Sequence, residues 1–68
     1  MKIQREDVER MKDLAKKVSV IRDPVAIHQL ETGFMHNMQP KYGEKTATEM
    51  LIKVWQLSDK LRKMETMA

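Results

Sequence analysis

Few side chains in this 68-residue chain could support chemistry. His28 and Glu31 are three residues apart, so both could face one ion from the same side of a helix. His36 lies eight residues beyond His28. On a helix this is roughly 11–12 Å, too far for one metal ion to bridge both rings. The chain has no cysteine, which excludes thiolate zinc sites. We therefore predict no metal site.

Nucleophilic catalysis also lacks the residues that it needs. Ser19 and Ser58 are the only serines, and neither has the flanking glycines that present a nucleophile on a strand–turn–helix elbow. A thiol nucleophile is absent, and two glycines in the whole chain cannot build a phosphate-binding loop. The sequence predicts no catalytic residue and no cofactor. We expect a protein that is not an enzyme.

Composition and length restrict the class of protein further. Hydrophobic residues make up 41% of the chain and charged residues 34%, which is typical of a folded soluble domain. No apolar run is long enough to cross a membrane, and the first residues are charged, so we expect a cytoplasmic protein. A single domain of this size has a marginal core, and without disulfides a second subunit is the most plausible source of further stability.

Prolines and glycines divide the chain into three segments with helical periodicity, which predicts an all-α, three-helix domain. The first helix should cover residues 4–18, and the 18–22 stretch beyond it could be helix, strand or connector. Asp23-Pro24 predicts the start of a second helix over residues 24–37, because Asp is a preferred N-cap and Pro suits the first helical position. Gly33 inside that helix predicts a close approach of two helices, with a functional hinge as the second choice.

The third helix, over residues 46–66, has the clearest pattern, and a loop over residues 39–45 should precede it. Thr46 and Glu49 fit a capping box at its start. Apolar residues then recur at the alternating three- and four-residue spacing of a coiled coil. The predicted oligomer seam consists of Met50, Val54, Leu57, Leu61 and Met64. Leu51 and Trp55 widen this apolar surface beyond one seam, so we expect the protein to form homo-oligomers.

These features favour a small protein–protein interaction module, such as an adaptor, an inhibitor or an assembly factor with a regulatory role. Seven methionines make the chain methionine-rich, and thioethers either fill gaps in a core or adapt to varied partners. Trp55 could anchor the core or form a binding hot spot. The predicted partner-binding residues are Met35, Met38, Leu51 and Trp55.

The alternative is a small dimeric DNA-binding regulator of helix-turn-helix or ribbon-helix-helix type. Over residues 18–57 the order of elements resembles the ribbon-helix-helix family, with residues 18–22 as the ribbon and a hydroxyl-rich turn from Thr46. That resemblance implies DNA contacts from the ribbon, and Lys16, Lys17 and Arg22 could then contact phosphates. However, neither face of such a strand offers good base-reading side chains. We therefore rank nucleic acid second to a protein partner.

Overall fold

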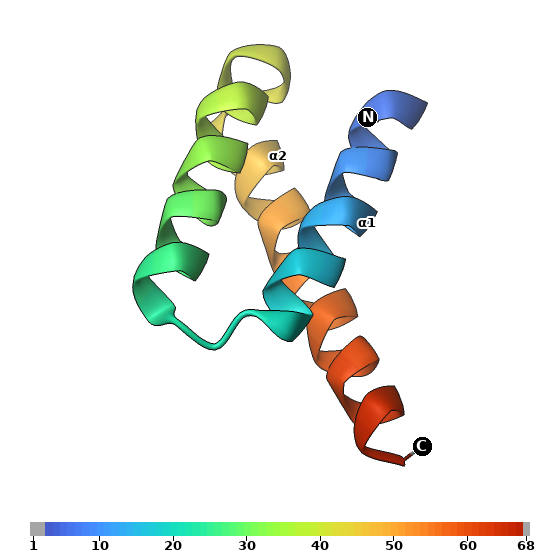
Figure 1. Cartoon of the computed structure of the whole chain (residues 1–68). Helices are drawn as coiled ribbons and strands as arrows, with labels where there is room; N and C mark the ends of the chain where they lie inside the picture. Colours follow the sequence, from blue (N-terminus) through green and yellow to red (C-terminus); the bar gives the residue numbers. More distant parts are fainter. Residues whose placement is uncertain (1–2, 68) are drawn as a thin grey trace.

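The computed structural model describes residues 3–67, and side chains through Met64. Two helices account for nearly all of these residues: α1 (Arg5–Val20) and α2 (Pro24–Met67). No strand occurs between residues 3 and 67, so the prediction of an all-α protein is confirmed there. Helix α1 packs against α2, which folds back on itself (Figure 1).

The prediction of three helices is wrong, because the expected loop over residues 39–45 is almost entirely helical. Helix α2 departs from helical backbone angles only at Gly43. We call residues 24–42 its first arm and residues 44–67 its second arm. A straight helix of this length would extend about 66 Å. The longest dimension of the molecule is 37 Å, so the two arms must fold back on each other, as Figure 1 shows. The reversal lies at Gly43, where the backbone leaves helical angles.

Gly43 makes this reversal within one residue. Its φ of 85° and ψ of 162° lie in a region that is essentially restricted to glycine. Pro40 lies inside the helix, although it suggested a loop in the sequence. Its fixed φ is compatible with a helix, and its missing N–H costs one backbone hydrogen bond close to where the first arm ends. The second arm begins at Glu44, so Thr46 lies in its first turn and not at the predicted cap.

The connector between α1 and α2 is short and well defined. Helix α1 continues to Val20, beyond the predicted end, and Ile21 is extended with φ −84° and ψ 133°. The 18–22 stretch is therefore the last helical turn followed by a connector, and the ribbon of a ribbon-helix-helix protein is missing. Asp23 caps α2 as predicted, because its Oδ1 accepts the Val25 N–H at 3.1 Å.

The core lies where α1 crosses the two arms of α2. It contains side chains from all three helical segments: Met11, Leu14, Ala15, Val18, Phe34, Met38, Ala47, Met50, Leu51 and Val54. Each large apolar side chain buried there stabilises the fold by about 1.5–3 kcal/mol. Gly33 is not part of a close helix contact, because a Cβ added there would meet no atom within 4 Å. The predicted close approach of two helices at this glycine is therefore wrong.

Candidate functional site

The four predicted partner-binding residues occupy different environments. Met38 and Leu51 are buried in the core, and Met35 is half-buried against it. Trp55 differs from them because 46% of its surface is exposed, although it is the largest apolar side chain in the protein. The structure therefore leaves Trp55 as the most accessible of the four, with Met35 partly accessible.

The Trp55 ring is held in place by the other arm of α2. Its indole N–H donates a hydrogen bond to the Glu31 carboxylate, which joins the two arms across 24 residues. Ile52, one turn earlier on the second arm, is 42% exposed. We call Glu31, Ile52 and Trp55 the Trp55 face. An aromatic ring with a fixed orientation and an apolar neighbour loses little conformational entropy when a partner covers it.

The predicted oligomer seam is divided between the core and the surface. Met50 and Val54 are buried within one chain, each with 1% exposure. Leu57 and Leu61 are only partly buried against the core, and Met64 is 62% exposed. The first half of the seam therefore packs within the chain. Only the stretch from Leu57 to Met64 is left for another molecule.

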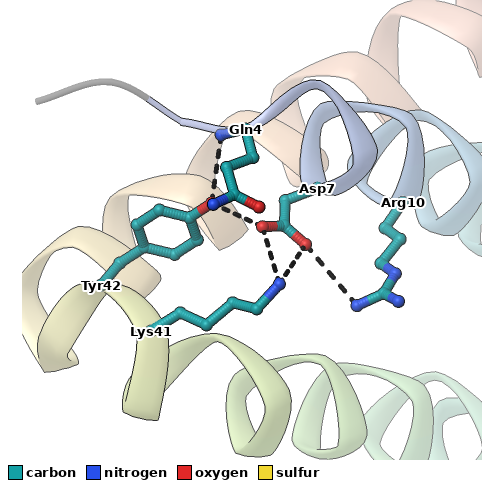
Figure 2. Close-up of polar contacts among 5 residues, drawn as sticks. All are labelled: Gln4, Asp7, Arg10, Lys41 and Tyr42. Atoms are coloured by element: carbon teal, nitrogen blue, oxygen red, sulfur yellow. Dashed lines mark hydrogen bonds and ion pairs between the residues drawn. The ribbon is translucent and has the colours of Figure 1, made fainter.

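A polar cluster that the sequence analysis did not anticipate joins α1 to the turn of α2 (Figure 2). The Asp7 side chain is fully buried. Its Oδ2 accepts the Tyr42 hydroxyl at 2.5 Å and lies 3.3 Å from the Lys41 ammonium. Its Oδ1 lies 3.5 Å from the Arg10 guanidinium. The Tyr42 hydroxyl oxygen in turn accepts the Gln4 N–H at 3.1 Å.

These partners keep the Asp7 carboxylate charged. The Tyr42 hydrogen bond lowers the pKa of Asp7 most, and Lys41 and Arg10 lower it further, while burial acts in the opposite direction. The net result is a pKa below the ordinary value of 3.8. Such a carboxylate is a poor proton donor near neutral pH, so the cluster is suited to joining elements and not to acid–base catalysis.

A signal for this cluster was present in the sequence. Asp7 lies four residues before Met11, which places it in register with the apolar stripe of α1. Acidic residues in the first turn of a helix also interact favourably with its N-terminus, so an aspartate at this position does not by itself indicate burial. The position of Tyr42 could not be inferred in the same way, because it depends on where the first arm ends.

The remaining candidates lie on the surface. His28 and His36 are both exposed. Within the part of the chain that the structure describes, no three His, Cys, Asp or Glu side chains are grouped as a metal site would require. Lys16, Lys17 and Arg22 are exposed around the end of α1. None of the helices over residues 3–67 is long and apolar enough to cross a membrane.

Comparisons with protein-family models, with curated proteins and with solved structures find no match to this chain.

Proposed function

We propose that the protein is a non-catalytic protein–protein interaction module that binds its partner through the Trp55 face. The observation that carries this proposal is the 46% exposure of Trp55, whereas ten other apolar side chains among the described residues are buried in the core. Tryptophan is among the residues that contribute most to protein interfaces, since a partner can cover a large apolar area around one ring.

The surroundings of Trp55 support this proposal. Its hydrogen bond to Glu31 satisfies the indole N–H, so a partner can cover the ring without leaving that donor unpaired. Ile52 extends the apolar surface along the same arm, and half-buried Met35 lies one turn beyond Glu31 on the first arm. A partner helix or loop with an apolar face fits such a surface.

The test is capture of partners from cell extract with matched variants. Wild type, Trp55→Ala and the neighbouring control Gln56→Ala are immobilised after circular dichroism shows that each is folded. Apolar burial is weakly affected by salt, so we expect wild type and Gln56→Ala to retain the same proteins at about 200 mM salt. Trp55→Ala should lose them. Identical protein sets for all three variants, or release of every protein by this salt concentration, would contradict the proposal.

A second candidate function is association between copies of this chain. The coiled-coil spacing continues past the residues that the core buries. Leu57 and Leu61 are only half-buried, and Met64 is 62% exposed, so these side chains remain available to another copy. We propose that this stripe, from Leu57 to Met64, pairs two second arms. This stripe offers less apolar area for association than the sequence suggested, because Met50 and Val54 are covered within one chain.

A further inference from the structure

Two groups of basic residues that are far apart in the sequence lie at the same end of the molecule. The Arg62 guanidinium donates a hydrogen bond to the Val18 carbonyl oxygen at 3.0 Å, across 44 residues. This bond joins the last turn of α1 to the second arm of α2, as their positions in Figure 1 show. We call residues 16–25 and 59–64 the basic end. Its exposed cations are Lys16, Lys17, Arg22, Lys60, Arg62 and Lys63.

The basic end holds all of the protein's excess positive charge. Its six cations and two carboxylates, Asp23 and Asp59, give a formal charge of +4, whereas the whole chain carries +3. Both carboxylates already have partners. Asp23 accepts the Val25 N–H at 3.1 Å, and Asp59 lies 3.3 Å from the Lys63 ammonium. This concentration of charge attracts an anionic partner to one end of the molecule.

The basic end also exposes aliphatic side chains. Val20, in the last turn of α1, is 64% exposed, and Val25, in the first turn of α2, is 63% exposed. They lie on either side of the short connector that carries Arg22. A partner that matches this surface needs carboxylates or phosphates for the cations and also apolar groups for the two valines.

We propose that the basic end binds an acidic protein segment in which aliphatic side chains alternate with carboxylates. A nucleic-acid backbone would satisfy the cations but offers little to cover Val20 and Val25. A second copy of the chain brings a second set of cations and so cannot neutralise the basic end, even where two copies pair through the stripe from Leu57 to Met64. A lipid surface is typically bound through exposed aromatic or leucine side chains among the cations. The only tryptophan lies outside this end, and Leu61, the one leucine within it, packs partly against the core. The proposal rests on the proposed function in taking the partner to be a protein.

The experiment titrates the full chain against a fluorescent helical peptide of about 20 residues built from Glu and Leu, in roughly 150 mM salt. Lys16→Gln with Arg22→Gln removes two cations from the basic end. Lys45→Gln with Lys53→Gln removes two exposed cations elsewhere and is the matched control. Since each exposed charge pair contributes modestly, we expect about fivefold weaker binding for the first pair and less than about twofold for the control. Val20→Thr with Val25→Thr should weaken binding by about two- to threefold.

Several outcomes would overturn the proposal. One is equal weakening by the two charge-removal pairs, which would mean that only net charge matters. Another is equally tight binding of a peptide with Gln in place of Glu. Tighter binding of duplex DNA or of phosphatidylserine vesicles, lost on Lys16→Gln with Arg22→Gln, would assign this end to a different class of partner. Trp55→Ala should leave peptide binding unchanged. A negative result in the peptide titration concerns only the basic end. It is therefore distinguishable from a negative result in the extract experiment, which tests the Trp55 face.

Discussion

At the scale of single residues, Asp7 shows how a charged side chain can be buried in so small a protein. Its carboxylate accepts the Tyr42 hydroxyl and faces two cations, so the cost of removing it from water is offset by charge-assisted hydrogen bonds. The side chains of Lys41 and Arg10 are 42% and 57% exposed, so water screens their ion pairs with Asp7. The Tyr42 bond is therefore the main stabilising contact of the cluster (Figure 2).

We expect Asp7→Asn to lower the free energy of unfolding at neutral pH by about 1–2 kcal/mol, because a hydrogen bond to a charged acceptor is replaced by one to a neutral amide. Urea denaturation measures this loss. Asp59→Asn is the control, since it also removes one negative charge, from an exposed pair with Lys63 that contributes less than about 1 kcal/mol. Equal losses of unfolding free energy in the two variants would show that the contacts of Asp7 stabilise the fold no more than an exposed ion pair does.

The same cluster predicts a pH dependence of stability. Because the pKa of Asp7 is lower in the folded protein than its ordinary 3.8, the unfolded chain binds more protons at pH values between the two. The contribution of Asp7 is complete above about pH 5 and is lost as pH falls through the folded-state pKa. We expect the stability difference between wild type and Asp7→Asn to shrink over this acid range. A difference that stays constant down to pH 2 would contradict the assignment.

At the scale of elements, the two glycines of α2 have opposite roles. Gly33 lies in the first arm with open space around it, and only Gly43 has a positive φ. A glycine in an exposed helix loses more conformational entropy on folding than alanine does. At Gly43, by contrast, the backbone adopts angles that an L side chain rarely accepts. The reversal of α2 therefore depends on one residue.

We expect the same substitution at these two positions to have opposite effects. Gly33→Ala should raise the free energy of unfolding by about 0.5–1 kcal/mol. Gly43→Ala should lower it by about 1–3 kcal/mol, because the alanine is strained at this φ and ψ. Gly43→Ala also favours a straight α2, whose exposed arms would pair with those of another chain, so a swapped dimer should appear in size-exclusion chromatography. A higher free energy of unfolding for Gly43→Ala would contradict the placement of the helix reversal at Gly43.

At the scale of the whole molecule, the apolar stripe and the basic end overlap on the second arm of α2. The stripe from Leu57 to Met64 lies on the second arm, and Lys60 and Lys63 lie on the same turns. Pairing of two stripes therefore buries apolar area but brings like charges closer. Salt screens that repulsion and leaves the apolar contribution intact.

We expect wild type to associate in sedimentation experiments at micromolar concentration, and to do so more strongly as salt rises from about 50 to 200 mM. Met64→Asp should produce a folded monomer, because Met64 is exposed and an aspartate there does not enter the core. Leu57→Asp is less informative, because Leu57 packs partly against the core and the substitution could unfold the chain. A wild-type monomer at both salt concentrations, or an unchanged dimer for Met64→Asp, would contradict pairing through the stripe.

The sequence by itself determined the helical content, the start of α2 and much of the core. The cap formed by Asp23 and Pro24 depends on neighbouring residues only, so local sequence predicts it. Apolar residues recur at helical spacing in α1, and periodicity alone places Val8, Met11, Ala15 and Val18 on one face; all but Val8, which is half-buried, lie in the core. Both predictions depend on contacts within a few residues.

Only the tertiary structure decided the turn and the surfaces. Pro40 and Gly43 suggested a loop, but the contacts of Lys41 and Tyr42 with Asp7, more than 30 residues away, tie the last turn of the first arm to α1. The exposure of Trp55 depends on how much of the second arm the other helices cover. The basic end exists because Arg62 meets the end of α1. These features arise from contacts between distant residues, which local spacing cannot specify.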